Sequence, residues 1–232
     1  MMKKTIRIAY QKSLPVMAGY IVLGIGFGIL MKDAGYGFLW SFFMSLTIYA
    51  GSMQYVGVSL LTSGASFITV ALTTLMVNAR HLFYGLSMIE KYKDAGKKKP
   101  YLIFALTDET YSLLCNDNIP EGAERQGYQF FISFFNQCYW ILGSVLGGLL
   151  GAILPFDTAG IDFSMTALFV TVLVEQWLTT KNHWPAISGL VISAACLGIF
   201  GPEKFLIPTM FMITIALLFM KRMQNPGGEN RE

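Results

Sequence analysis

Four ionisable side chains lie inside apolar stretches of this chain, where a charge is expensive. Arg80 ends a run from Ala34 to Ala79 that holds no charged residue, Asp108 and Glu109 stand side by side in a fourth apolar segment, and Glu175 ends another uncharged run. Ionisable residues in such settings usually face a partner or a water-filled cavity. We predict that Arg80 pairs with Asp108 or Glu109 and that the other acid faces a pathway.

These side chains suit proton or charge transfer more than bond-making chemistry. A carboxylate in a cavity of low dielectric constant holds a proton more readily than one in water, so Asp108, Glu109 and Glu175 are candidates for a proton or charge relay. The alternative for Glu175 is a residue at the membrane boundary, and the alternative for Arg80 is a side chain that reaches back to the cytoplasmic surface. No catalytic arrangement and no metal spacing is present, so we expect neither an enzyme nor a cofactor.

The elements that must position these groups begin with the uncharged run Ala34–Ala79. It is about twice as long as the ~20 residues that one helix needs to cross a bilayer, so it must fold. Small and polar residues at Ala50–Gln54 interrupt the middle of the apolar segment Phe38–Leu61. Backbone leaves the helix at membrane depth only inside protein or against a cavity, which is how many transporters build a substrate site.

Composition places the whole chain in the membrane. Hydrophobic residues make up 54% of its 232 residues and charged residues only 13%, against about 25% charged in soluble domains. The net charge of +3 is too small to suggest a nucleic-acid partner. We predict an all-α polytopic protein with a single transmembrane domain, residues 1–232, and about seven to eight hydrophobic segments: Ser13–Met31, Phe38–Leu61, Ser66–Ile89, Tyr101–Cys115, Tyr128–Leu154, Phe163–Thr180, Trp184–Phe200 and Phe205–Met220.

Basic residues predict the orientation. The N-terminus carries Lys3, Lys4, Arg7 and Lys12. Five lysines lie in residues 91–99, which we call the lysine loop. We expect both regions in the cytoplasm. The acidic loop Asn116–Gln126 is expected outside. Two cytoplasmic ends require an even number of crossings, yet three apolar segments lie between them. We favour a re-entrant hairpin for Phe38–Leu61 that turns at Ala50–Gln54; the alternative is that the lysine loop breaks the rule.

A loose internal repeat connects two glycine-rich segments. Tyr20–Gly28 resembles Tyr139–Gly147, which suggests repeat-like halves at about residues 13–115 and 128–220. With the second copy starting outside, the repeat would be inverted, as in many secondary transporters. The alternative is a chance match between segments whose small residues let helices approach closely.

A zwitterionic amino acid would find complementary groups in this chain. An ammonium needs acceptors or a carboxylate, and a carboxylate needs helix N-terminal amides or an arginine. We predict Ser52, Gln54, Asn78 and Arg80 as substrate-binding residues around the interrupted segment. Phenylalanine, leucine and the 13 methionines offer an adaptable apolar wall.

Several blocks together resemble the AzlC-type family, the large subunit of bacterial branched-chain amino acid exporters. The resemblance implies a multi-pass inner-membrane protein that exports leucine, isoleucine and valine, with methionine as a further candidate, driven by the membrane gradient. It also implies a small hydrophobic AzlD-type partner subunit. The alternative is a non-transporting membrane scaffold, or a transporter of another small zwitterion. The blocks that carry the resemblance are Pro15-x3-Gly19, Phe27-Gly28, Tyr49–Gln54, Asn78–Ser87, Thr107–Tyr111 and Asp162-Phe163-x3-Ala167-Leu168-Phe169.

Overall fold

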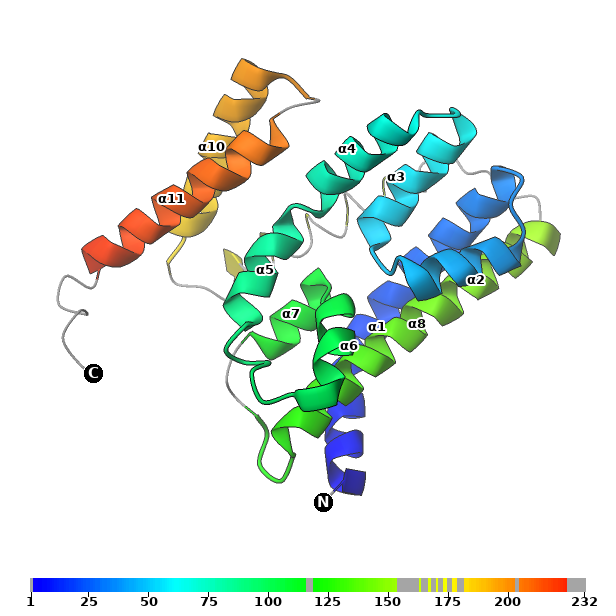
Figure 1. Cartoon of the computed structure of the whole chain (residues 1–232), viewed down its shortest axis with the longest axis horizontal. Coiled ribbons are helices and arrows are strands. Elements are labelled where there is room, and N and C mark those ends of the chain that lie inside the picture. The colour runs from blue at the N-terminus through cyan, green and yellow to red at the C-terminus, as the bar shows by residue number, and fades with distance from the viewer. Residues whose placement is uncertain are drawn as a thin grey trace. The chain divides into compact units, whose positions relative to one another are not determined.

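The computed structural model of the chain describes residues 2–115, 119–153, 182–202 and 205–224, with isolated residues between 163 and 178. All regular structure in these ranges is helical, as the composition and segment pattern predict. The chain divides into two compact units, residues 1–168 and 169–232. The first unit holds most of the candidate site residues, and its helices are followed in Figure 1.

Two long helices form the spine of the first unit. Helix α1 (Met2–Asp33) and helix α8 (Arg125–Ile153) lie side by side along their length (Figure 1). At 1.5 Å per residue they are about 48 and 44 Å long, enough to cross the ~30 Å hydrocarbon core. They are the two described helices long and apolar enough to span a membrane.

Glycines let the two backbones of the spine touch. A Cβ placed on Gly28 would lie 2.2 Å from the Ser144 carbonyl oxygen, and one on Gly147 would lie 2.1 Å from the Ile25 carbonyl oxygen. Neither position has room for a side chain, because the atom in the way is backbone. The alternative interpretation of the repeat, close helix approach through small residues, describes this contact directly.

The two copies of the glycine motif run in the same direction. Near the start of both helices, the Glu124 amide donates to Thr5 Oγ1 at 3.0 Å, and near their ends Gly151 packs against Lys32. Copies related by an axis in the membrane plane would run in opposite directions. The predicted inversion is therefore wrong for Tyr20–Gly28 and Tyr139–Gly147, whose likeness comes from their shared packing seam.

A first re-entrant hairpin packs against the C-terminal half of the two spine helices. Helix α2 (Phe38–Thr47) starts beside Gly148 near the end of α8, and helix α3 (Gly51–Thr62) folds back along it. The Gln54 amide nitrogen donates to Ser45 Oγ at 3.0 Å, which joins the two arms. The predicted break near Ala50–Gln54 is confirmed, since Phe38–Leu61 forms two helices that fold back on each other.

The chain then returns along the unit in two collinear pieces. Helix α4 (Phe67–Asn78) is capped by Ser66, whose Oγ accepts from the Thr69 amide at 3.2 Å. Helix α5 (Arg80–Met88) follows after a break at Ala79. Together they lead from the end of the first hairpin back to the lysine loop, which holds the short 3-10 helix η1 (Gly96–Lys98).

A second re-entrant hairpin enters from the lysine-loop end. Helix α6 (Lys99–Phe104) turns at Ala105–Thr107 into helix α7 (Asp108–Leu114). The Lys91 ammonium donates to the Cys115 carbonyl oxygen, so α7 ends beside the loop from which α6 begins. The segment Tyr101–Cys115 therefore doubles back, although its turn contains neither glycine nor proline.

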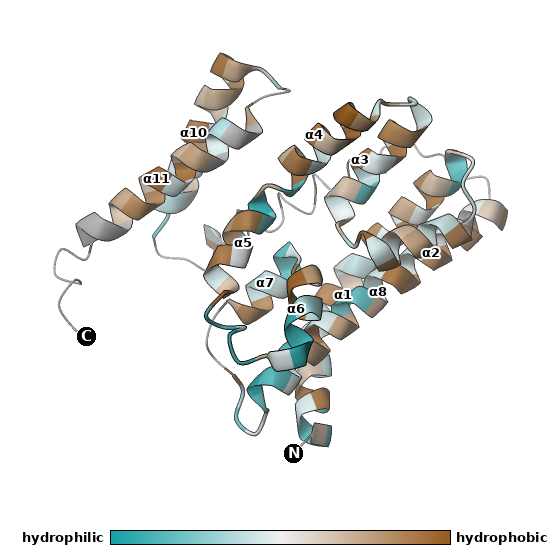
Figure 2. Ribbon diagram, in the orientation of Figure 1, coloured by the Kyte–Doolittle hydropathy of each residue, from teal (hydrophilic) through white to brown (hydrophobic). Residues whose placement is uncertain are grey.

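One end of the unit gathers the start of α1, the lysine loop and residues 119–126; we call it the basic end. The Gln126 amide nitrogen donates to the Asp94 carbonyl oxygen at 2.5 Å, and the Thr5 contact described above joins the same end. Figure 2 shows hydrophilic residues gathered in the loop between α5 and α6 and at the start of α8. The prediction that the loop Asn116–Gln126 lies opposite the N-terminus is wrong for its described part. Tyr101–Cys115 does not cross, and acidic residues contribute little to orientation.

The second unit is described as two packed helices. Helix α10 (Trp184–Phe200) begins with Pro185 in its first turn, and helix α11 (Leu206–Gln224) packs against it. Cys196 is buried between them, with its Sγ 3.6 Å from Met212 Sδ. Most other large apolar side chains of α10 and α11, such as Ile199 and Phe219, remain exposed.

Candidate functional site

The tips of the two hairpins meet beside the middle of α1. The rings of Tyr49, at the tip of the first hairpin, and Phe104, at the tip of the second, have centroids 6.2 Å apart. Tyr49 is buried and has a φ of 44°, the one positive φ of a non-glycine residue in the part of the chain that the structure describes. Strain of this kind persists where surroundings impose it, and it gathers at functional sites.

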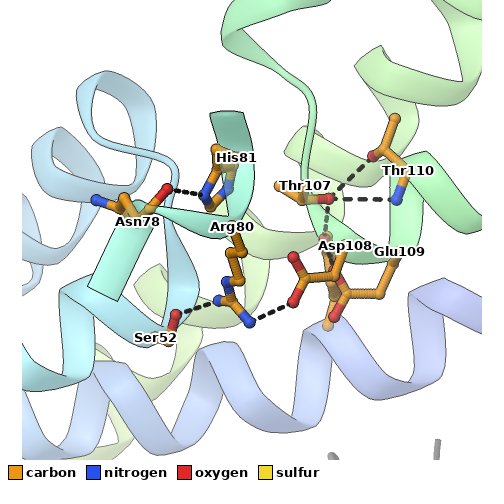
Figure 3. A network of polar contacts seen from close by, with 9 residues as sticks. Ser52, Asn78, Arg80, His81, Thr107, Asp108, Glu109 and Thr110 are labelled. Atoms are coloured by element: carbon orange, nitrogen blue, oxygen red, sulfur yellow. Dashed lines mark hydrogen bonds and ion pairs between the residues drawn. The ribbon is translucent and has the colours of Figure 1, made fainter. Parts of the chain in front are cut away.

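Arg80 connects the two hairpins electrostatically. Its Nη1 lies 2.5 Å from Asp108 Oδ2 at the start of α7, and its Nη2 donates to Ser52 Oγ in the first turn of α3 (Figure 3). Both side chains of the ion pair are 25% exposed. The prediction that Arg80 pairs with one of the neighbouring acids is confirmed, and the partner is Asp108.

The starts of α3 and α7 differ in how their backbone amides are satisfied. No side chain caps α3, which follows Ala50, so the first amides of its N-terminal turn lack helical acceptors. Thr107 caps α7, accepting from the Thr110 amide at 3.3 Å. The partial positive charge of a helix N-terminus at α3 therefore adds to the Arg80 guanidinium, while the start of α7 carries two acids.

Glu109 belongs to a buried hydroxyl network. The Tyr20 hydroxyl of α1 donates to Glu109 Oε2 at 2.6 Å and lies equally close to Thr107 Oγ1. Thr107 Oγ1 donates to Thr110 Oγ1 at 3.1 Å, which also accepts from Asn136 Nδ2 of α8 at 3.0 Å. Sequence reasoning missed Tyr20, Thr110 and Asn136, because neutral polar residues carry no charge signal. Thr107 was findable, since a threonine before two acids is a helix N-cap signature.

Gln54 lies in a separate network on the other side of α3. It is fully buried, its Oε1 accepts from Trp140 Nε1 at 2.8 Å, and its amide nitrogen donates to Ser45. Ser45 in turn donates to Ser144 Oγ at 2.8 Å. Gln54 and Ser52 are thus neighbours in sequence that serve different clusters.

The remaining predicted residues have mixed placements. Asn78 ends α4 two residues before Arg80, its backbone oxygen is 3.2 Å from His81 Nδ1, and its buried side-chain oxygen has no hydrogen-bond partner among the described residues. Glu175 lies outside the described residues.

An apolar groove of about 620 Å³ begins next to the ion pair. It runs between α5 and α6 from His81, the neighbour of Arg80, to Lys99 at the basic end. Apart from His81, Tyr92 and Lys99, its described lining is aliphatic or glycine: Leu82, Gly85, Leu86, Met88, Ile89, Ile103 and Leu106.

Two half-helix hairpins that meet inside an apolar helical unit, around a charge pair, define a polytopic membrane protein with a polar site at depth. A profile of the AzlC protein family matches residues 15–154. The chain belongs to the AzlC family. It is 41% identical over 216 residues to the "Branched-chain amino acid transport protein AzlC" of Bacillus subtilis, covering 93% of this chain and 85% of the relative.

Other relatives carry membrane-protein names. An "Uncharacterized membrane protein" of Haemophilus influenzae is 44% identical, covering 91% of this chain and 87% of the relative. The "Inner membrane protein YgaZ" of Escherichia coli is 28% identical, covering 90% of this chain and 83% of the relative. No solved structure is significantly similar to this chain.

Proposed function

We propose that this chain is the large subunit of a secondary transporter that exports branched-chain amino acids across the bacterial cytoplasmic membrane. The observation that carries the proposal is the meeting of an uncapped helix start, α3, with the Arg80–Asp108 pair at the middle of the unit. The name of the Bacillus subtilis relative supports the substrate class, and that of the Escherichia coli relative supports the membrane.

The substrate carboxylate would bind at the start of α3. There the free backbone amides, the Ser52 hydroxyl and the Arg80 guanidinium all favour an anion. The ammonium would bind on the opposite side, where Asp108, Glu109 and the unpartnered amide oxygen of Asn78 offer acceptors. A zwitterion is thus matched at both ends by groups that already face each other.

The substrate side chain would enter the start of the apolar groove. The groove begins at His81, beside Arg80, and its aliphatic lining from α5 and α6 suits a branched hydrocarbon. An apolar wall with few polar groups distinguishes side chains by one methylene only weakly, about 1–3 kcal/mol. We therefore propose leucine, isoleucine and valine as substrates, with methionine as a further one.

Gln54 takes a supporting place in this proposal. Its amide is held by Trp140 and Ser45, so it fixes the position of α3 rather than touching the substrate. Glu109 and Glu175 stay proposed proton relay residues, while Asp108 is proposed to act through its charge, as the partner of Arg80.

The orientation follows from the basic residues. The start of α1 and the lysine loop share the basic end of the unit, and clustered lysines favour the cytoplasmic side. We propose a cytoplasmic N-terminus, with the first hairpin entering from outside and the second from the cytoplasm. The gradient as the energy source and a small AzlD-type hydrophobic subunit as the partner are proposed from the family resemblance.

Leucine efflux from cells loaded with leucine dipeptides tests this proposal. Cells without their own exporters would express this chain with and without the small partner, and with and without a protonophore. We expect efflux only when both the partner and the gradient are present. Efflux of another zwitterion but not of leucine would replace the proposed substrate. If the protein is well folded in the membrane and the cells export no amino acid, the scaffold alternative is favoured.

A further inference from the structure

The two neighbouring acids at the start of α7 have partners of opposite chemical character. Asp108 contacts the Arg80 guanidinium at 2.5 Å, which has only donors and stays charged. Glu109 contacts the Tyr20 hydroxyl at 2.6 Å, which can donate or accept. A guanidinium offers its carboxylate only donors, whereas a hydroxyl can donate to a carboxylate or accept from a carboxylic acid, and the bond to the charged form is the stronger of the two.

The Tyr20 hydroxyl has a second acceptor ready for its one hydrogen. Thr107 Oγ1 lies 2.6 Å from the same oxygen, and its own hydrogen is directed to Thr110 Oγ1. When Glu109 is ionised, Tyr20 donates to it. When Glu109 binds a proton, the acid donates to Tyr20 Oη and the hydrogen of Tyr20 turns to Thr107. Both protonation states therefore keep the hydrogen bonds of this network filled.

Further hydrogen bonds hold the Thr107 and Thr110 hydroxyls in place. Asn136 Nδ2 donates to Thr110 Oγ1 at 3.0 Å, and the Thr110 amide donates to Thr107 Oγ1. Tyr20 is 4% exposed, and Thr107, Thr110 and Asn136 are also buried. The network thus draws its members from helices α1, α7 and α8 and from Thr107, the N-cap of α7.

We infer that Glu109 is the residue that binds and releases the coupling proton, that Asp108 is a permanent counter-ion of Arg80, and that Tyr20 is the positioning residue that lets Glu109 change its protonation state. This inference deepens the proposed transport function and rests on it for the movement of the proton across the membrane. In the step itself, one proton from water binds a Glu109 oxygen and later returns to water, and no other bond is made or broken.

Other charged and titratable groups also face Glu109. They are Arg80 and Tyr84 of α5, Tyr49 at the tip of the first hairpin, and Asp108 on α7 itself. A Tyr20→Phe change leaves all of these in place. It removes the hydroxyl that donates to ionised Glu109 and accepts from protonated Glu109, together with its contact to Thr107.

The test is a pH titration of the carboxyl groups of the purified full chain by infrared spectroscopy, which needs no substrate. We expect one component of the carboxylic-acid absorption to titrate in the wild type and to be missing in Glu109→Gln, while the other carboxyl groups of the chain titrate in both proteins. In Tyr20→Phe the midpoint of this component should rise by about one pH unit, because a hydrogen bond to a charged group is lost. Tyr139→Phe is the matched control, since its hydroxyl contacts Ser13 at 3.0 Å on the same helix pair rather than an acid. It should leave the midpoint unchanged.

An unmoved midpoint of this component in Tyr20→Phe, or the same component still present in Glu109→Gln, would overturn the inference. The Tyr20→Phe comparison does not depend on Glu109→Gln accumulating in the membrane. Leucine efflux measured against pH adds a second readout, and its midpoint should move with that of this component. Absence of leucine efflux with an intact, Tyr20-sensitive titration would remove the proposed function and leave the assignment of Glu109 and Tyr20 standing.

Discussion

The two re-entrant hairpins solve the same problem in different ways. Each ends a helix inside the unit and starts another there, which leaves backbone amides without helical partners. The second hairpin satisfies its new helix with the Thr107 side chain. The first hairpin leaves the start of α3 without a side-chain cap, beside a strained Tyr49.

The capped turn of the second hairpin has a structural role, whereas the uncapped start of α3 is available to a ligand. A capped turn is complete by itself, so α6 and α7 can hold Asp108 and Glu109 in fixed positions. An uncapped turn is complete only when something else supplies the acceptor. We therefore expect changes of the capping Thr107 to affect mainly folding, and changes at the start of α3 to affect mainly ligand binding.

The largest expected effect comes from breaking the charge pair that joins the hairpins. Arg80→Gln or Asp108→Asn alone leaves a poorly solvated charge, a loss of roughly 3–5 kcal/mol for a buried pair. Each single variant should accumulate poorly in the membrane, as measured by the yield and melting temperature of the purified protein. The double variant should recover both, and a double variant no better than the singles would argue against the pair.

The next largest effect is expected from disturbing the contact between α1 and α8, against which both hairpins pack. In Gly28→Ala the new methyl group would overlap the Ser144 carbonyl oxygen, and overpacking of this kind costs about 1–3 kcal/mol. The melting temperature should fall. Gly19→Ala on the same helix is the control, because nothing lies within 4 Å of its Cβ position, and it should be neutral or stabilising.

Gln54→Ala tests the supporting role assigned to this residue. It leaves Trp140 Nε1 and Ser45 without their buried partner, with a loss of about 1–3 kcal/mol. We expect a lower melting temperature and a reduced maximal rate of efflux, with little change in the substrate concentration at half-maximal rate. A variant of normal stability whose half-maximal concentration rises would place Gln54 in the substrate site instead.

The smallest effects on stability contrast the two hairpin turns directly. Thr107→Ala removes a helix cap, which costs about 1 kcal/mol, together with the buried hydroxyl that contacts Tyr20 and Thr110, and should lower the melting temperature. Ser52→Ala removes no cap, and should leave the melting temperature nearly unchanged while raising the leucine concentration needed for half-maximal efflux. Equal losses of stability in both variants would mean that the start of α3 is also a structural turn.

Much of the first unit follows from local signals in the sequence. The break in Phe38–Leu61 is visible because Ala50–Gln54 puts small and polar residues into an apolar run. The turn at Ala105–Thr107 has no glycine or proline, so only the capping threonine marks it. The wrong prediction for the loop Asn116–Gln126 follows from this one missed turn. When Tyr101–Cys115 is counted as a membrane crossing, the predicted side of the membrane is inverted for the loop that follows it.

Charge made part of the site predictable from the sequence. The contacts that depend on how a helix is rotated about its axis were not predictable. A buried arginine requires an acid, so the pairing of Arg80 was foreseeable. The choice between Asp108 and Glu109 depends on the rotation of α7, since adjacent helical residues point about 100° apart. The contact between Tyr20 and Glu109 joins residues far apart in sequence, and neither residue type specifies the other.

The parallel spine has a consequence for synthesis. Helix α8 is the main partner of α1, yet about 90 residues separate the end of one from the start of the other. At ~5–20 residues per second, α1 waits several seconds for its partner. During that interval both hairpins have emerged with only half of their packing surface, and the first also has the uncapped start of α3 at its tip. Nascent chains that stop before Arg125 should therefore remain bound to the insertion machinery, and release should coincide with the arrival of the glycines of α8.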